Sequence, residues 1–360
     1  MKKFVSILMT LVLTLSLAAG AMAEPMANVA ALKGPTAMGM VKMMSDDAGA
    51  NWNFTIAAAA DEIAPKLIQG ELDIAAVPAN LAATLYNKTQ GKVQVLAINT
   101  LGVLYIIENG ETVQSVEDLK GRTIYSAGQG ATPEYALNYI LKENGIDPTT
   151  DVNIIFSKEH TECLNAVMNN PTAVALLPQP FVTTAMTKAP GVRIALDLNQ
   201  LWADVQEGKE NQSALLTGVV VARKEFVENN PEAVNAFMDA YAASVAFANE
   251  DVDATAALIG SYEIVPEAVA KAALPYCCIV MIEGEEMQQK LSGYLQVLFD
   301  QNPASVGGAM PNEEFYFQRY ESQNAPVGCG FLVAGLADCR HADASAVATG
   351  LPIGDLAAAG

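Results

Sequence analysis

The chain has 360 residues, of which 51% are hydrophobic and 17% charged, as expected of a globular protein with a large core. Its 40 acidic residues against 20 basic ones give a net charge of −20, which disfavours nucleic-acid binding because that function needs a basic surface. The length allows two domains of ordinary size, and the five cysteines show no spacing typical of a disulfide framework.

The first 23 residues have the pattern of an export signal. Lys2 and Lys3 precede an apolar stretch at 5–17, and residues 21–23 (Ala-Met-Ala) fit the small-residue cleavage pattern. The stretch is too short for a comfortable membrane span, and no later one reaches about 18–20 uninterrupted apolar residues. We therefore expect cleavage near Ala23 and an exported protein, with an uncleaved membrane anchor as the alternative.

Strand and helix patterns alternate through the first third of the mature sequence. Apolar runs predict strands at 28–32, 53–57, 72–77, 93–99 and 103–108. Helical spacing predicts helices at 62–69 and 81–86, and a methionine-rich helix after the loop 33–36. We expect these methionines to fill the core rather than to bind a metal.

A strand, a glycine loop and a helix then follow one another at 122–145. Residues 122–126 favour a strand, Gly128 and Gly130 lie in the loop, and Thr132 with Pro133 is typical of a helix start. Such a loop directs backbone N–H groups and the positive end of the helix dipole at one spot. The pattern predicts a ligand site here, with simple turn glycines as the alternative.

The order strand, helix, strand, proline loop occurs once in each half of the chain. Val77-Pro78 matches Leu177-Pro178 at an offset of 100 residues, and strands are predicted at 154–157 and 173–177 with helices at 162–168 and from Phe181. Such alternation implies right-handed crossovers and mainly parallel sheets, which bind ligands at the carboxyl ends of their strands. The apolar runs 93–108 and 215–222 predict two extended crossings that also serve as hinges.

The last third of the chain is predicted to be helical and then disordered. Helices are expected at 232–248, 253–259, 266–273 and 285–299. Cys277 and Cys278 are expected to be buried small apolar residues. Residues 321–360 become Ala/Gly-rich and predict a poorly ordered tail, whose Cys, Asp and His residues match no standard zinc pattern, so no metal is expected.

Three stretches carry a family resemblance: 118–124 (DLKGRTI) with 132–135 (TPEY), 70–75 (GELDIA) and 221–226 (VARKEF). From about residue 28 to 320 the chain resembles the solute-binding proteins of bacterial ABC importers, in the branch of the nitrate, sulfonate, taurine and thiamine-precursor binders. The resemblance implies a type II periplasmic-binding fold. Its two α/β lobes are lobe 1 (24–101 and 215–320) and lobe 2 (102–214), with two crossing strands between them.

The same resemblance implies a receptor that closes on a small solute and delivers it to a membrane permease, as a monomer without a cofactor. Carried over by position, the ligand-binding residues are Gly34, Pro35, Thr36, Pro78, Ala79, Asn80, Thr100, Gly128, Gln129, Gly130, Ala131, Thr132, Pro178 and Gln179. Tyr135 could sandwich a planar ligand or lie in the core. The first cysteine is Cys163, which favours a free periplasmic protein over one tethered by lipid.

Enzyme functions find less support in the sequence. A dinucleotide fingerprint would need a third glycine where Pro133 stands, there is no G-x-S-x-G motif, and the chain has only two histidines. A thiamine-precursor synthase of the same fold would carry a longer cysteine motif than Cys277-Cys278. We therefore expect no catalysis. The charge of the solute stays open, because helix N-termini favour an anion whereas Glu134 and Glu162 suit a cation.

Overall fold

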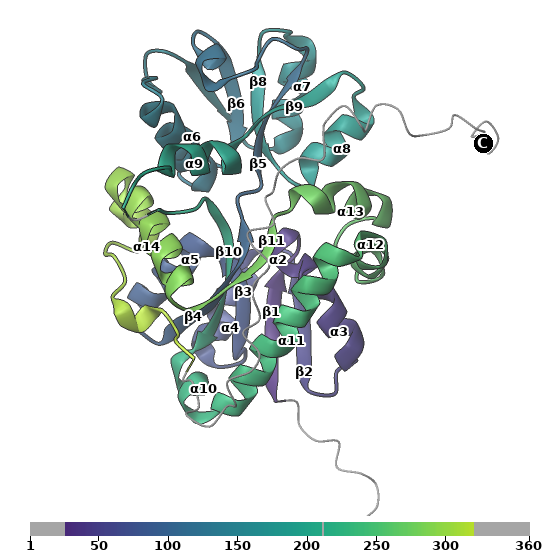
Figure 1. The fold of residues 1–360 in the computed structure, drawn as a ribbon, viewed down its shortest axis with the longest axis vertical. Helices are drawn as coiled ribbons and strands as arrows, with labels where there is room; N and C mark the ends of the chain where they lie inside the picture. The colour runs from purple at the N-terminus through teal and green to yellow at the C-terminus, as the bar shows by residue number, and fades with distance from the viewer. Residues whose placement is uncertain (1–25, 211, 320–360) are drawn as a thin grey trace, which may run out of the picture.

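The computed structural model describes residues 26–210 and 212–319, which form two β-sheets with helices on their faces, one sheet above the other along the long axis (Figure 1). The predicted signal peptide and the predicted tail lie outside the described residues. Among the described helices, none is long and apolar enough to cross a membrane.

The lower sheet has six strands in the order β11-β4-β10-β3-β1-β2. Its strands are β1 (Ala27–Leu32), β2 (Trp52–Ala57), β3 (Ile74–Pro78), β4 (Val93–Leu101), β10 (Leu216–Arg223) and β11 (Ile279–Ile282). Strand β1 pairs in parallel with β2 and β3, whereas β10 is antiparallel to β3 and β4, and β11 to β4.

The upper sheet has five strands in the order β7-β6-β8-β5-β9. They are β5 (Leu104–Asn109), β6 (Thr123–Ala127), β7 (Asn153–Ser157), β8 (Val174–Pro178) and β9 (Val192–Asp197). Strand β6 is parallel to β7 and β8, and β5 is antiparallel to β8 and β9. Every predicted strand overlaps one of those observed, but β9 and β11 were not predicted.

The α/β fold with two sheets is confirmed, but both sheets are mixed rather than mainly parallel. The reason is the direction in which the chain enters each sheet. Strand β5 begins at Leu104, where the chain has just left the lower sheet, while its neighbour β8 ends at that level, so the two must run in opposite directions. Strand β10 returns to the lower sheet in the same way, beside β3.

The helices cover the faces of both sheets. They are α2 (Pro35–Met38), α3 (Val41–Asp47), α4 (Ala60–Gln69), α5 (Ala79–Lys88), α6 (Thr132–Glu143), α7 (His160–Asn169), α8 (Phe181–Lys188), α9 (Leu198–Gln206), α10 (Lys224–Asn229), α11 (Pro231–Glu250), α12 (Val252–Ser261), α13 (Glu267–Ala273) and α14 (Gly284–Gln301). Short 3₁₀ turns are η1 (Val116–Leu119), η2 (Leu274–Tyr276), η3 (Pro303–Val306) and η4 (Glu313–Phe315). The four predicted C-terminal helices correspond to α11–α14.

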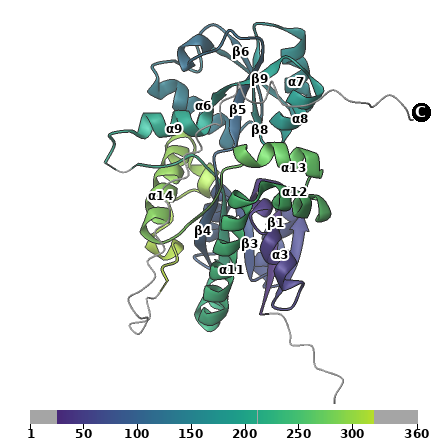
Figure 2. The ribbon, with the colours of Figure 1, turned by 45° about the vertical axis from the view of Figure 1, so that its right-hand side comes forward.

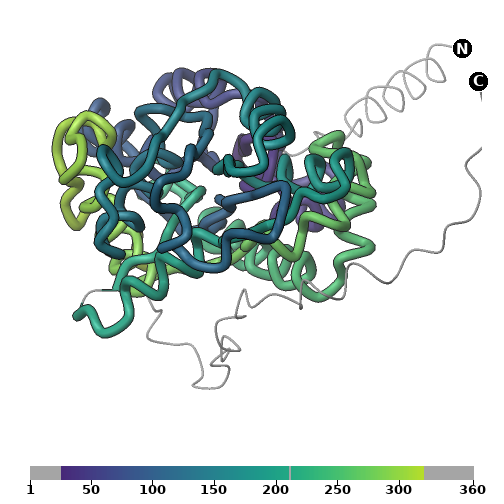
Figure 3. The backbone as a smooth tube through the Cα atoms, turned by 90° about the horizontal axis from the view of Figure 1, so that it is seen from above, coloured from purple at the N-terminus to yellow at the C-terminus, as the bar shows by residue number. Residues whose placement is uncertain are grey.

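Two helices link the two halves of the molecule. Helix α14 packs on α6, and α13 lies against α8 (Figure 2). Seen from above, the yellow-green α14 region and the green α12–α13 region lie on opposite sides of the molecule (Figure 3). The two sheets are therefore held together at both flanks.

The core confirms the apolar periodicities. The predicted face of α11, which includes Phe237, Met238 and Tyr241, is buried, and the methionines Met38, Met43 and Met44 are buried in the same cluster. Cys277 and Cys278 are buried, as expected of small apolar residues.

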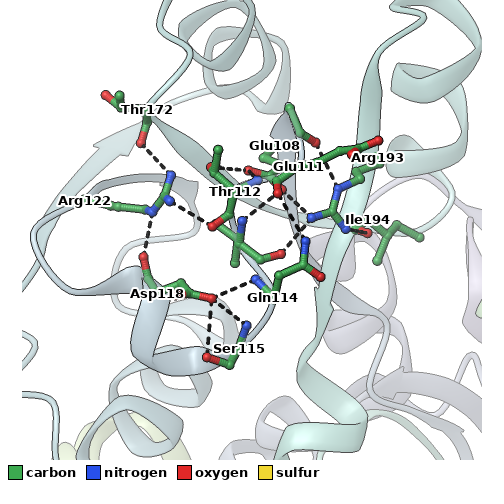
Figure 4. Close-up of polar contacts among 12 residues, drawn as sticks. Glu108, Glu111, Thr112, Gln114, Ser115, Asp118, Arg122, Thr172, Arg193 and Ile194 are labelled. Atoms are coloured by element: carbon green, nitrogen blue, oxygen red, sulfur yellow. Dashed lines mark hydrogen bonds and ion pairs between the residues drawn. The ribbon is translucent and has the colours of Figure 1, made fainter.

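A buried carboxylate organises the outer end of the upper sheet (Figure 4). The side chain of Glu108 is completely buried and accepts hydrogen bonds from Thr112 N (3.1 Å), Thr112 Oγ1 (2.8 Å) and Val113 N (3.1 Å), and it forms an ion pair with Arg193 Nη2 (2.5 Å). Burial alone would raise the pKa of Glu108, but the hydrogen bonds and Arg193 outweigh it and hold the pKa below its ordinary value. The ion pair ties the start of β9 to the end of β5.

Candidate functional site

Two crossing segments join the sheets side by side. The first runs from Leu101 to Leu104, between β4 and β5, and the second reaches β10 through Leu215. Leu216 pairs with Leu101, and a Cβ on Gly102 would lie 2.7 Å from Cδ2 of Leu215. At this close approach, the backbone N–H of Gly102 also donates to Asn199 Oδ1 (3.2 Å).

The two proline loops occupy equivalent places beside these crossings. Pro78 ends β3 and pairs with Gly218 of β10, while Pro178 ends β8 and pairs with Leu104 of β5. Each proline leads within three residues into a helix, α5 or α8. The offset of 100 residues noted in the sequence therefore corresponds to matching positions on the two sheets.

Three of the predicted ligand segments meet at Gly218. Asn99 Nδ2 donates to the carbonyl of Thr36 (3.1 Å), and Thr100 Oγ1 donates to Asn99 Oδ1 (3.3 Å). A Cβ on Gly218, the partner of Pro78, would collide with Thr36 Cγ2 and lie 2.6 Å from Asn99 Oδ1. Sequence reasoning missed Asn99 and Gly218, although an isolated glycine in a strand pattern indicates a close approach of this kind.

Gln179 carries an unpaired buried donor. Its backbone N–H donates to Val103 O in the first crossing (2.9 Å), and its side-chain Oε1 accepts from Thr183 N (3.2 Å) and Thr183 Oγ1 (2.9 Å). The side chain is only 3% exposed, and Nε2 has no hydrogen-bond partner among the described residues. A buried donor without a hydrogen-bond partner costs about 1–3 kcal/mol of stability, so Nε2 of Gln179 is suited to donate a hydrogen bond to a ligand.

The glycine loop before α6 is largely satisfied from within. Gly128 and Gly130 have the left-handed φ values of 94° and 73° that favour glycine. Gly130 N donates to Glu134 Oε2 (2.6 Å), Ala131 N donates to Gly128 O (3.1 Å), and Pro133 has no N–H. The expectation that free N–H groups converge here is therefore wrong for Gly130 and Ala131. Gln129, between Gly128 and Gly130, is exposed.

Thr132 and Tyr135 face α14. Thr132 Oγ1 and Tyr294 Oη lie 2.9 Å apart, and Tyr135 Oη accepts from Asn302 Nδ2 (3.0 Å). Gln301 Nε2 donates to the carbonyl of Tyr135 (3.0 Å), whose ring is buried in the core. Of the two alternatives for Tyr135, core packing is thus what the structure shows, and both residues contribute to the contact between α6 and α14.

The remaining predicted residues lie at the N-terminal ends of helices α2 and α5. Gly34 and Pro35 precede and begin α2, and Pro35 is half-buried. Ala79 is buried at the start of α5, and Asn80 is half-buried one residue later. The first turn of α5 has neither a capping side chain nor an acidic residue, so its backbone donors are open to an acceptor.

An aromatic pair lies between α7 and α8. The His160 and Phe181 rings are 5.4 Å apart between centroids and tilted by 46°. His160 Nδ1 is buried without a hydrogen-bond partner, and burial lowers the pKa of His160, which favours the neutral imidazole. Phe181 is the first residue of α8, two positions after Gln179.

A cavity of about 700 Å³ lies at the other end of the lower sheet. It is bordered by Val93, where β4 begins, and by Arg223, where β10 ends, whereas the crossings involve the opposite ends of both strands. Two of the basic residues that line it form ion pairs, Arg223 with Asp73 (2.6 Å) and Lys224 with Glu314 (2.9 Å). This cavity is distinct from the crossing segments.

Two sheets of this order, connected by paired crossings where loops of both sheets meet, define the fold of periplasmic substrate-binding proteins. The family model described as "ABC transporter, phosphonate, periplasmic substrate-binding protein" matches residues 37–263, more than half of the chain, and the chain belongs to this family. The predicted class, a substrate-binding receptor of an ABC importer, is confirmed, and the enzyme alternative gains no support. A search of curated proteins found no match.

Solved structures show the same fold. An ABC transporter protein from Parabacteroides distasonis is 23% identical, with a TM-score of 0.68 over 82% of this chain and 99% of that one. The aliphatic sulphonate-binding protein SsuA from Escherichia coli is 14% identical, with a TM-score of 0.64 over 84% and 94%. A putative sulfonate-binding SsuA from Methylobacillus flagellatus is 18% identical, with a TM-score of 0.56 over 78% and 86%. At these identities the likeness concerns the fold alone.

Proposed function

We propose that this chain is a non-catalytic receptor that binds one small solute between lobe 1 (24–101 and 215–320) and lobe 2 (102–214). It acts as a monomer and delivers the solute to the permease of an ABC importer. One observation carries the proposal: the proline loops of both sheets pair with the crossing strands, Pro78 with Gly218 and Pro178 with Leu104. A solute held there would touch both lobes, and the crossings would act as hinges for closure.

The ligand contacts are assigned to five segments: 34–36, 78–80, Thr100, 128–132 and 178–179. The open first turn of α5 and the unpaired Nε2 of Gln179 support this assignment, because both offer hydrogen-bond donors without internal acceptors. For the loop 128–132 the support is weaker, because two of its N–H groups already have acceptors. Tyr135 would act by holding α6 against α14 rather than by touching the solute.

The raised pKa values of two cysteine thiols, Cys163 and Cys277, support the absence of catalysis. Burial raises the pKa of the Cys163 thiol, and it raises that of Cys277 to about 12, whereas a catalytic cysteine needs a lowered pKa. The export signal, with cleavage near Ala23, supports a periplasmic location, which is where receptors of this family act.

A thermal-shift screen of the purified mature chain tests the proposal. A solute at 100 times its Kd stabilises the folded state by about 2.7 kcal/mol, which raises the melting temperature by several degrees. The screen should include phosphonates and sulfonates, which the names of the family and of its structural neighbours contain, beside neutral and cationic solutes. Turnover of a stabilising compound, followed by mass spectrometry, would contradict the non-catalytic role.

A further inference from the structure

We infer that the two proposed lobes part on one flank only, the side of α8 and α13, and that the hydrogen bond from Tyr105 to Tyr276 holds this flank closed between openings. The opposite flank, where α14 packs on α6, stays together and moves as part of the hinge. A solute then enters and leaves past Tyr276. The inference rests on the proposed function, because it assigns an entrance to the same solute site.

One hydrophobic cluster runs through both lobes on the side of α6 and α14 (Figure 2). It contains Leu137 of α6 and Trp202 of α9 from lobe 2, together with Tyr294 and Leu298 of α14 from lobe 1, each at most 1% exposed. The rings of Trp202 and Tyr294 are 5.9 Å apart between centroids. Parting the lobes on this side would bring these side chains into water, which the hydrophobic effect opposes in proportion to the apolar area exposed.

Polar contacts reinforce the same flank. The hydroxyls of Thr132 and Tyr294 are 2.9 Å apart. Tyr135 accepts two further hydrogen bonds from the end of lobe 1, at its hydroxyl from Asn302 Nδ2 (3.0 Å) and at its carbonyl from Gln301 Nε2 (3.0 Å). Opening this flank would therefore break several hydrogen bonds in addition to exposing the shared core.

Helix α14 also lies directly against the second crossing segment. A Cβ on Gly293 would lie 2.7 Å from Cβ of Ser213 and 3.4 Å from its Cα, so the glycine permits a close approach of the two segments. The hydroxyl of Ser213 in turn accepts from Trp202 Nε1 (3.0 Å), and both side chains are buried. Helix α14, the crossing and α9 are thus packed as one unit at the hinge.

The side of α8 and α13 has two separate cores instead. Among the described residues, one cluster belongs wholly to lobe 1 and includes Tyr241 and Ile279, whereas the buried residues of the other, which include Leu177 and Val182, all belong to lobe 2. Tyr276 is the one described residue of lobe 1 that packs against the lobe 2 cluster. Parting the lobes here leaves both cores intact, so this flank opens at a lower cost than the other.

Tyr105 of β5 binds Tyr276 across this flank. Its hydroxyl donates to the carbonyl of Tyr276 (2.8 Å), and the two rings meet edge to face, with centroids 6.2 Å apart and planes at 88°. Tyr105 is buried in lobe 2, whereas Tyr276 is half-buried at the end of η2. A neutral hydrogen bond of this kind changes an equilibrium constant by about two- to tenfold, so it favours the closed flank without locking it.

Distances between pairs of spin labels, measured by double electron–electron resonance on the mature chain without solute, test the inference. One pair, Lys188→Cys with Ala272→Cys, spans the flank of α8 and α13. The other pair, Lys142→Cys with Gln296→Cys, spans the flank of α6 and α14. All four positions are exposed, so the labels disturb neither core.

The native cysteines do not interfere with the labelling. Cys163, Cys277 and Cys278 are at most 5% exposed and stay unlabelled in the folded chain. The background chain carries Cys329→Ser and Cys339→Ser.

The same substitution on each flank separates the two roles. Tyr105→Phe removes the hydroxyl that binds Tyr276, and it should raise the ratio of long to short distances in the α8–α13 pair about two- to tenfold. Tyr294→Phe removes one hydroxyl from the α6–α14 flank and is the matched control. Because the shared core remains, it should leave the distances of both pairs as they are in the wild type.

A second, longer distance in the α6–α14 pair, in the wild type or in either variant, would overturn the inference. So would a distance ratio in the α8–α13 pair that Tyr105→Phe leaves unchanged. The receptor function fails separately, through a thermal-shift screen in which no compound binds, because the distances are measured without a solute.

Discussion

Replacing Gly218 with alanine tests the packing at the crossings. The new methyl group would collide with Thr36 Cγ2 and lie 2.6 Å from Asn99 Oδ1. Neither neighbour is free to move, since Thr36 Oγ1 donates to Leu32 O (2.8 Å) and Asn99 Nδ2 holds the carbonyl of Thr36 (3.1 Å). Overpacking of this kind costs about 1–3 kcal/mol, and here the strain would displace the α2 loop and Thr100 together.

We therefore expect Gly218→Ala to lower the free energy of unfolding in urea by about 2 kcal/mol and to weaken solute binding at least tenfold. Gly208→Ala is the matched control: Gly208 has a φ of +77° but open space around it. That change should cost about 1 kcal/mol through backbone strain and leave binding unchanged. A Gly218→Ala protein with wild-type stability and wild-type affinity would refute the reasoning.

Three other changes address the contacts that hold the fold. Glu108→Gln should lower the free energy of unfolding by about 3 kcal/mol, because it leaves Arg193 without its buried partner; an effect below about 1 kcal/mol in urea would be contrary to this account. Because the folded state lowers the pKa of Glu108, its contribution is present above the ordinary value of 4.5 and is lost as the pH falls below it. Urea titrations between neutral and acidic pH should thus show a steeper acid loss in the wild type than in Glu108→Gln. Thr132→Val should lower the free energy of unfolding by about 1 kcal/mol, because it removes the hydrogen bond to Tyr294. Thr149→Val, in an exposed turn, should lower it less, because water more easily replaces the hydrogen bond that is lost.

The order of elements was predictable because apolar periodicity and the proline loops are local signals. Residues 72–77 and 173–177 were recognised as strands followed by Pro78 and Pro178, and the structure places both at the crossings. The direction of β5 and β10 could not be read in this way, because a strand has the same pattern whichever way it runs. Strand β9 and helix α9 were not predicted from the sequence either.

The site was less predictable because it depends on side-chain contacts. The sequence of the loop 128–132 predicted free backbone donors, but the carboxylate of Glu134 already accepts a hydrogen bond from the backbone N–H of Gly130. A glutamate at the third position of a helix often reaches back to the preceding loop, and this signal was present in the sequence. Gln179 was singled out for its place between prolines, but its unpaired Nε2 follows from the contacts of Thr183, which no pattern reveals.

A structure of the chain with the solute found by the screen would test the central claim most directly. The account predicts a solute at the crossings, within hydrogen-bond distance of Gln179 Nε2 and in contact with residues of both lobes. A solute bound in the cavity between Val93 and Arg223, or one that touches a single lobe only, would contradict it.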